Sequence, residues 1–238
     1  MIYVVGLGPG HSGMRTGEAT RAIQRADVIV GYGVYVDLIR GEFPDRETFT
    51  TGMRGEVERC RAAVEFSRAG KTVAVVCSGD ASVYGMASLI LELTDPEDDV
   101  EIVPGVTAAL AASAILGAPL SGDMAIVSLS DLLTPWETIR RRLEAAAWGD
   151  FPIAIYNPAS KKRADYLARA AETLLARLPG TTVCGWVRNI AREGREKGIT
   201  PLDRLAEVPA DMFTTVIVGN SMTVQMNGRL VTPRGYRK

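Results

Sequence analysis

The chain has few of the residues that build disulfide frameworks and metal centres. Its 238 residues include three cysteines and one histidine. Cys60, Cys77 and Cys184 lie far apart in apolar segments and form no Cys-x-x-Cys pair. This spacing argues against paired disulfides and against a zinc site. We therefore expect three reduced thiols in the core and no metal site in the protein itself.

The chain also lacks an excess of charge of either sign and any long apolar run. Lys and Arg total 27, and Asp and Glu total 28, so no overall field attracts the protein to nucleic acid or to a membrane surface. No apolar stretch approaches the roughly 20 residues that a membrane helix needs. Met1 leads directly into the strand-like segment 2–5, with no signal-like segment before it. We expect a cytoplasmic protein with no nucleic-acid or membrane partner.

Short β-branched segments alternate with segments of helical periodicity along the first half of the chain. Strands are predicted at 2–7, 28–30, 72–77 and 100–103. One helix is predicted at 106–116, and another has an apolar face made of Val83, Met86, Ala87 and Ile90. This alternation is typical of a parallel sheet covered by helices, and it predicts the α/β class.

A break rich in glycine and proline at 117–122 precedes a second alternating series. We place the domain boundary there, with domains 1–119 and 120–238. Thr134, Pro135 and Glu137 have the spacing of a capping box, which predicts a helix with Thr134 as its N-cap. Further elements are predicted as strands at 124–129, 153–156, 183–187 and 214–218, a helix at 163–178, and a terminal hairpin around Asn227-Gly228.

A glycine-rich segment follows the first predicted strand, and it has three interpretations. Gly8, Gly10 and Gly13 fit the pattern G-x-G-x-x-G of dinucleotide-binding loops. Such a site also needs an acidic residue at the end of the second strand, but Asp27 stands at the start of that strand. A phosphate-binding loop needs a lysine that 13–16 lack. The alternatives are a tight turn with no ligand and the ligand loop of another class of enzyme.

Three segments taken together resemble the tetrapyrrole methylases, two-domain α/β enzymes that bind folded S-adenosylmethionine in the cleft between their domains. The segments are 6–10, 77–85 (Cys-Ser-Gly-Asp-Ala-Ser-Val-Tyr-Gly) and 103–109 (Val-Pro-Gly-Val-Thr-Ala-Ala). Ala81 stands where the family usually has proline. The resemblance implies the family's class III methyltransferase fold, with a mainly parallel sheet in the N-terminal domain and a mixed sheet in the C-terminal domain.

The resemblance also implies which residues contact the methyl donor. In the N-terminal domain they are Pro9, Ser78, Gly79, Asp80, Val83, Tyr84, Thr107 and Ala108. In the C-terminal domain they are Tyr156, Asn157, Arg188, Asn189, Ile190, Thr214 and Thr215. Asp80 lies just beyond the carboxyl end of a predicted strand, so its carboxylate either meets the cationic donor or accepts hydrogen bonds. The alternative role for Asp80 is a plain helix N-cap.

Four further segments, 31–39, 130–137, 156–163 and 187–194, are similar to the branch of the family that methylates carbon 17 of a cobalamin precursor and contracts its ring. This resemblance implies conversion of precorrin-3B to precorrin-4, within a homodimer. The nearer alternative is the cobalt-containing anaerobic substrate, cobalt-factor III. The distant alternative is a nucleotide-binding oxidoreductase or regulatory module.

The implied substrate is a macrocycle that carries many carboxylates, so basic side chains beside the motifs are candidate partners. The candidate substrate-binding residues are Gly10, His11, Ser130, Asp131, Lys161, Arg163 and Arg192. Methyl transfer from sulfur depends on alignment and needs no protein nucleophile, whereas ring contraction needs a base. The candidate bases, in order, are His11, Asp131 and Tyr84. Solvated charges and an incidental loop histidine are the alternatives.

Overall fold

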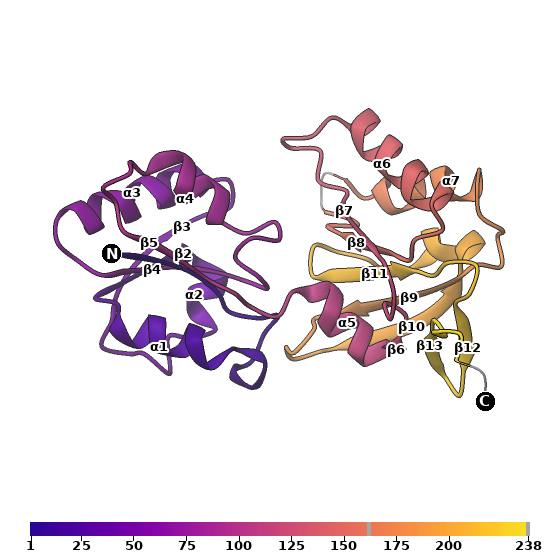
Figure 1. Cartoon of the computed structure of the whole chain (residues 1–238), viewed down its shortest axis with the longest axis horizontal. Helices are drawn as coiled ribbons and strands as arrows, with labels where there is room; N and C mark the ends of the chain where they lie inside the picture. The colour runs from indigo at the N-terminus through magenta and orange to yellow at the C-terminus, as the bar shows by residue number, and fades with distance from the viewer. Residues whose placement is uncertain (161–162, 237–238) are drawn as a thin grey trace. The chain divides into compact units, whose positions relative to one another are not determined.

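A computed structural model describes residues 1–160 and 163–236 (Figure 1). The chain divides into two compact units, Met1–Ala108 and Ala109–Lys238. Each unit has a sheet and an apolar core of its own. Among the described residues, no helix is both long enough and apolar enough to cross a membrane.

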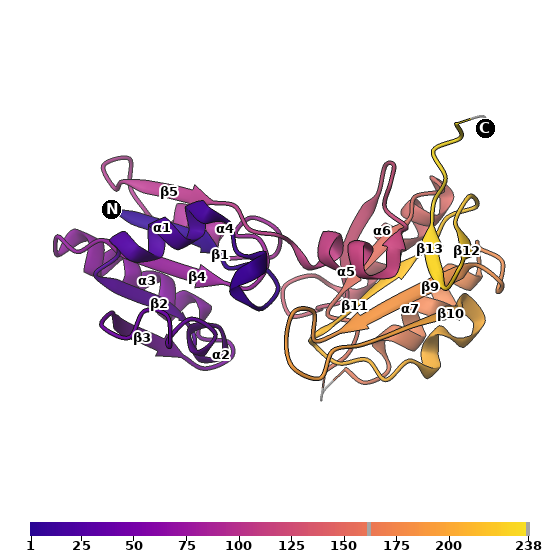
Figure 2. The same ribbon diagram turned by 90° about the horizontal axis from the view of Figure 1, so that it is seen from below.

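The N-terminal unit is a five-stranded parallel sheet with helices on both faces. Its strands follow the order β3-β2-β4-β1-β5, which Figure 2 shows from bottom to top. The strands are β1 (Ile2–Gly6), β2 (Val28–Tyr32), β3 (Glu47–Thr51), β4 (Val73–Cys77) and β5 (Val100–Val103). The helices are η1 (Ser12–Met14), α1 (Gly17–Arg25), α2 (Gly33–Asp37), α3 (Glu56–Arg68) and α4 (Ala87–Leu93). β1 and β4 are buried along their whole length, as expected of parallel strands covered on both faces.

The two faces of this sheet carry separate apolar layers. Helices α3 and α4 cover one face through residues such as Cys60 and Ile90, and α1 and α2 cover the other through residues such as Ile23 and Val36 (Figure 1). All three cysteines are free and buried, as predicted. Burial raises the pKa of Cys60 and Cys77 to about 11 and that of Cys184 to about 12. The thiols therefore stay protonated and unreactive at neutral pH.

The C-terminal unit contains a mixed five-stranded sheet of order β10-β9-β11-β8-β7, in which only the β7–β8 pair is parallel. Its strands are β7 (Ala125–Ser128), β8 (Ile153–Tyr156), β9 (Val183–Arg188), β10 (Glu196–Pro201) and β11 (Thr214–Val218). Its helices are α5 (Ala108–Leu116), α6 (Trp136–Trp148), α7 (Tyr166–Leu175) and η2 (Leu202–Glu207). A parallel sheet in the first unit and a mixed sheet in the second confirm the predicted fold class.

A small sheet of order β12-β13-β6 places α5 and its following strand in the second unit. It consists of β6 (Gly117–Ala118), β12 (Val224–Met226) and β13 (Arg229–Val231), with the predicted hairpin at Asn227-Gly228. Gly117 pairs with Leu230, and the Ala109 N–H donates to the Tyr156 hydroxyl at 2.7 Å. The compact units therefore divide at the first residue of α5, between 108 and 109. The sequence places the boundary at 119/120 because its glycines and prolines mark the turn that follows β6.

Four helices begin later than predicted: α5 at Ala108, α7 at Tyr166, and the helices α6 and α4. The Thr138 and Ile139 N–H groups donate to the Pro135 carbonyl, so α6 starts at Trp136 with Pro135 as its N-cap, and the capping role predicted for Thr134 is wrong. Helix α4 starts only at Ala87, so Val83 lies outside it. Tyr84 adopts a φ of 56°, which ends any right-handed helix at that point.

Candidate active site

The three glycine motifs meet at the carboxyl edge of the N-terminal sheet. Strands β4, β1 and β5 are parallel neighbours, so the loops that follow them leave the sheet at the same edge. Gly8 and Gly79 exchange backbone hydrogen bonds of 3.0 and 2.8 Å, which join the first motif to the second. A Cβ on Gly105 would lie 2.1 Å from the Gly79 oxygen and 2.6 Å from the Gly6 oxygen. The third motif therefore packs against the other two only with glycine at position 105.

Asp80 holds the second and third motifs together through its carboxylate. Its Oδ1 accepts the N–H groups of Ser82 at 2.8 Å and Val83 at 3.2 Å, and its Oδ2 accepts the Gly105 N–H at 2.9 Å. Burial raises the pKa of Asp80, but the backbone donors from Gly105, Ser82 and Val83 outweigh burial and hold the pKa below its usual range. The helix N-cap interpretation is wrong, since α4 starts at Ala87. Direct contact with a cationic donor stays a prediction.

The donor residues predicted in the N-terminal unit surround this edge. They are Pro9, Ser78, Gly79, Asp80, Val83, Tyr84, Thr107 and Ala108. A Cβ on Gly79 would make only ordinary contacts, 3.8 Å from the Thr107 Cα and 3.9 Å from the Ala108 nitrogen. The φ of Gly79 is 73°, however, in the region that favours glycine. Glycine is required here by backbone conformation, whereas at position 105 it is required by packing.

A second group of predicted residues gathers at one edge of the mixed sheet. Strands β7 and β8 end there, and Thr214 at the start of β11 pairs with Arg188 at the end of β9. The predicted residues at this edge are Ser130, Asp131, Tyr156, Asn157, Arg188, Asn189, Ile190, Thr214 and Thr215. Sequence reasoning missed Ser128, whose Oγ accepts from Asn157 Nδ2 at 2.9 Å and from the Ser130 N–H at 3.2 Å. This hydroxyl therefore links the residues that follow β7 to the residue that follows β8.

Left-handed backbone marks the strand ends at this edge. Asn157, Asn189 and Ala191 have φ values of 52°, 53° and 54°. Asparagine tolerates this conformation better than most residues, and an alanine there is strained. Such strain persists where the surrounding structure holds it, and it concentrates at ligand sites. The asparagine directly after each of two strands was the sequence signal for these turns.

Asp131 belongs to a polar cluster that sequence reasoning found only in part. The Tyr166 hydroxyl donates a hydrogen bond to Asp131 Oδ2, and Arg163 Nη1 lies 3.6 Å from Asp131 Oδ1. The hydrogen bond to Asp131 raises the pKa of Tyr166, which keeps the hydroxyl protonated as a donor. Trp136 packs edge-on against the Tyr166 ring, and the Arg169 guanidinium lies 4.8 Å from the centre of that ring. Tyr166 sits at the first position of α7, and sequence reasoning did not identify it.

Two arginines at this edge each keep one buried N–H without a hydrogen bond among residues 1–160 and 163–236. These groups are Arg163 Nη1 and Arg188 Nε. Other atoms of both side chains are held, because Arg163 Nε donates to Ser160 at 3.2 Å and Arg188 Nη2 donates to Glu196 at 2.5 Å. Buried donors are normally paired, so both positions suit an anionic ligand.

Two predicted substrate-binding residues of the second unit remain, Arg192 and Lys161. The Arg192 guanidinium lies 5.0 Å from the centre of the Phe213 ring, just ahead of β11. Lys161 lies outside the described residues. Of the predicted basic substrate partners, Arg163 is therefore the one whose buried N–H, without a hydrogen bond among the described residues, gives a specific test.

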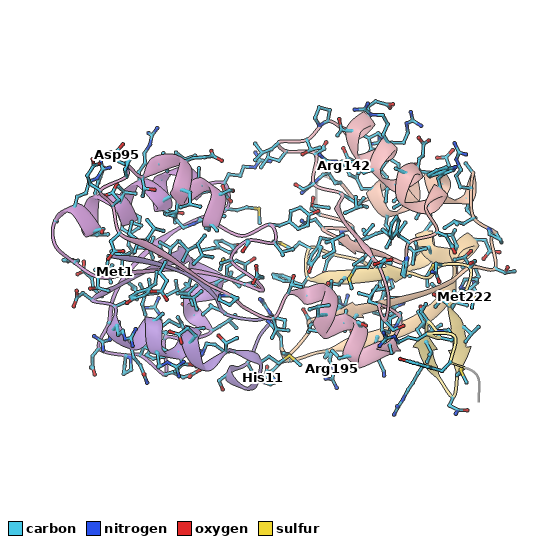
Figure 3. The ribbon with its side chains drawn as sticks, viewed as in Figure 1. Met1, His11, Asp95, Arg142, Arg195 and Met222 are labelled. Carbon is cyan, nitrogen blue, oxygen red and sulfur yellow. The ribbon has the colours of Figure 1, made fainter. Side chains whose placement is uncertain are left out.

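His11 lies on the exposed loop between β1 and α1, where Figure 3 labels it, directly after Gly10. Its Nδ1 accepts the Gly13 N–H at 3.0 Å, and it serves as N-cap of η1. The lone pair of the first-ranked base candidate is therefore already occupied.

The first unit has a parallel sheet with interlocked glycine loops at its carboxyl edge, and the second has a mixed sheet with polar strand ends. This arrangement defines a two-unit α/β protein whose candidate ligand-binding residues lie at the ends of its strands. The Tetrapyrrole (Corrin/Porphyrin) Methylases family profile matches residues 1–206. The chain is 45% identical over 239 residues to the probable cobalt-factor III C(17)-methyltransferase of Salmonella typhimurium, covering 99% of each chain. It is 38% identical over 246 residues to the precorrin-3B C(17)-methyltransferase of a Sinorhizobium species, covering 99% and 96%. The crystal structure of the methyltransferase CobJ matches with a TM-score of 0.91 at 38% identity, covering 98% and 99%. The chain belongs to the tetrapyrrole methylases.

Proposed function

We propose that the protein is an S-adenosylmethionine-dependent methyltransferase that methylates carbon 17 of precorrin-3B and contracts the ring in cobalamin biosynthesis. The observation that carries the proposal is similarity over the full chain to two enzymes named for this carbon. The cobalt-containing substrate is the second candidate, because the relative named for cobalt-factor III has the higher identity. Turnover of the metal-free and the cobalt-containing macrocycle, followed by the mass and absorbance of the product, tests the two candidates.

The N-terminal unit contributes donor binding through its interlocked loops. S-adenosylmethionine supplies the transferred methyl group when bound. Gly79 has a φ of 73°, a backbone conformation that favours glycine, and Asp80 fixes the second and third motifs relative to each other. Loops that are already fixed lose little conformational freedom when a ligand binds. Alignment of the reactants supplies much of the acceleration in a displacement reaction.

The C-terminal unit contributes carboxylate recognition. Arg163 Nε donates to Ser160, and Arg163 Nη1 lies 3.6 Å from Asp131 without a hydrogen bond to any described residue. Arg188 Nη2 donates to Glu196, and Arg188 Nε has no hydrogen bond within the described part of the chain. A carboxylate accepts such donors strongly. The two arginines are therefore proposed to bind carboxylates of the macrocycle, which moves Arg188 from the predicted donor contacts to the substrate contacts.

The geometry also reorders the candidate bases. His11 uses its acceptor nitrogen on Gly13. Asp131 has two carboxylate oxygens with several lone pairs, of which the Tyr166 hydroxyl takes one. We therefore place Asp131 ahead of His11 as the base for ring contraction, and Tyr84, on its left-handed loop, remains third.

Donor binding has a direct physical test. S-adenosylhomocysteine at about 100 times its Kd is expected to stabilise the protein by about 2.7 kcal/mol, which corresponds to a melting temperature higher by about 5 to 10 °C. NAD is expected to leave the melting temperature unchanged, because no acidic residue ends β2 to hold a ribose. Scanning calorimetry with each compound measures both effects. Stabilisation by NAD alone would exclude the methyltransferase.

The two arginines give a second prediction. Arg163→Ala and Arg188→Ala are each expected to raise the tetrapyrrole KM by about 10-fold or more, since a hydrogen bond to a charged group contributes about 1.5 to 3 kcal/mol. The affinity for S-adenosylhomocysteine should stay within about twofold of wild type, which is the size of effect expected of a substitution that removes no contact with the donor. Arg204→Ala is the matched control, because this exposed arginine pairs only with Glu207 among the described residues. Loss of donor affinity in Arg188→Ala would instead assign that residue to the donor.

A further inference from the structure

His11 is held in a single hydrogen-bonding state by its own loop. The Gly13 N–H donates to Nδ1 at 3.0 Å. A ring nitrogen that accepts a hydrogen bond carries no proton, so in the neutral imidazole the proton must be on Nε2. If Nδ1 were protonated, its N–H would face the Gly13 N–H, and this hydrogen bond would be lost.

The occupied nitrogen has a chemical consequence. With Nδ1 bonded to Gly13 and a proton on Nε2, the neutral ring presents only an N–H donor to a ligand and has no free lone pair. A general base needs a lone pair within reach of the proton that it removes. A neutral imidazole can instead act as an electrophile that stabilises negative charge on oxygen.

The position of His11 makes such a donor available. The residue is exposed on the loop that leaves β1 at the carboxyl edge, three residues beyond the Gly8–Gly79 backbone contact. Ligands of open α/β sheets bind at this edge. We propose that His11 donates a hydrogen bond from Nε2–H to an oxygen atom of the macrocyclic substrate and is not the base of the ring contraction. This inference rests on the proposed function.

The tautomer can be measured without any turnover. His11 is the only histidine in the chain, so ¹⁵N labelling of histidine in tag-free protein gives one imidazole to observe. Long-range ¹H–¹⁵N correlation at about pH 8.5, where histidine is ordinarily neutral, should show a protonated Nε2 and an unprotonated Nδ1. A protonated Nδ1 would overturn the inference.

Two conservative variants separate the possible roles of the ring. Asparagine in His11→Asn places an acceptor where Nδ1 lies, so it keeps the contact with Gly13 but lacks the outer donor. Glutamine in His11→Gln places an N–H near Nε2 and gives up the contact. Relative to His11→Ala, glutamine should restore about 10-fold of the lost activity and asparagine little of it, since one hydrogen bond to a charged oxygen has about this effect.

Kinetics then identify the oxygen. If the partner is a side-chain carboxylate, His11→Asn raises the tetrapyrrole KM and leaves the single-turnover contraction rate unchanged. If it is the oxygen on the ring carbon that is expelled, the contraction rate falls and KM does not change. S-adenosylhomocysteine affinity should be unaltered in every variant.

Other outcomes contradict the donor role. Equal losses in the alanine, asparagine and glutamine variants would restore His11 as the base. Full activity in His11→Asn with loss in His11→Gln would limit the residue to holding its loop, and full activity in all three would make it a bystander. A wild-type protein that neither binds S-adenosylhomocysteine nor methylates the macrocycle would refute the proposed function. This result differs from every outcome that refutes only the role of His11.

Discussion

Replacing Gly105 by alanine is expected to destabilise the N-terminal unit by about 3 kcal/mol or more, at the upper end of the usual cost of overpacking, and to abolish donor binding. The added Cβ would meet the Gly79 oxygen at 2.1 Å and the Gly6 oxygen at 2.6 Å. Both are backbone atoms beside the central strands, so neither can rotate away as a side chain would. Gly105 is not among the left-handed glycines, so the effect measures packing alone. Urea unfolding and calorimetry with S-adenosylhomocysteine measure the two losses.

Gly41→Ala is the matched control in the same unit. Gly41 lies in an exposed turn, and a Cβ there would meet nothing within 4 Å. Its effect on the free energy of unfolding should stay within about 0.5 kcal/mol, as for ordinary surface changes. A Gly105→Ala protein that unfolds and binds S-adenosylhomocysteine as wild type does would mean that the three motifs do not interlock as described.

Asp80→Asn is expected to reduce stability by about 2 kcal/mol, because a hydrogen bond to a charged group contributes about 1.5 to 3 kcal/mol. Asparagine has one carbonyl oxygen, so it can serve either the Ser82 and Val83 donors or the Gly105 donor, and its NH₂ group would face the other set. The second and third motifs would then separate, and donor affinity should fall with stability. Urea unfolding and titration with S-adenosylhomocysteine measure both.

The pH dependence of this loss has a definite sign. The folded-state pKa of Asp80 is lowered, so its stabilisation is present above the ordinary aspartate pKa of about 3.9 and is lost as pH falls through the folded value. The stability difference between wild type and Asp80→Asn should be constant near neutrality and shrink below about pH 3.9. Asp45→Asn, at an exposed position in the same unit, is the matched control for the substitution itself. A gap that persists unchanged in acid would contradict the carboxylate's role as a tether.

Most strands could be predicted because their residues carry strong local signals. β1 and β4 are continuous apolar runs, as parallel strands buried on both faces must be, and Asn227-Gly228 has the composition of a hairpin turn. The edge strands β3 (Glu47–Thr51) and β10 (Glu196–Pro201) were missed because they are half exposed and polar. Their pairing is decided by the neighbouring strand and not by their own composition.

Helix boundaries and polar contacts between distant residues were harder to predict from the sequence. The residues around Val83 have a helical apolar pattern, yet the Asp80 carboxylate takes two N–H groups and delays α4 until Ala87. Tyr166 gave no sign of a polar role, because its partner Asp131 is distant in sequence and on another loop. Local propensity cannot anticipate a hydrogen bond to a residue that only folding brings near.

The sequence by itself determined the α/β class, the positions of the main strands along the chain and the family, because hydrophobic periodicity and glycine-rich motifs are local properties of the chain. Only the tertiary structure decided that Gly6, Gly79 and Gly105 lie in backbone contact, that the Asp80 carboxylate accepts the Gly105 N–H, and that His11 Nδ1 accepts the Gly13 N–H. Parallel strand order brings together loops that are about 25 residues or more apart along the chain, as in the contact between Asp80 and Gly105. The direction of a hydrogen bond and the space left for a Cβ depend on those neighbours, and no local pattern encodes them.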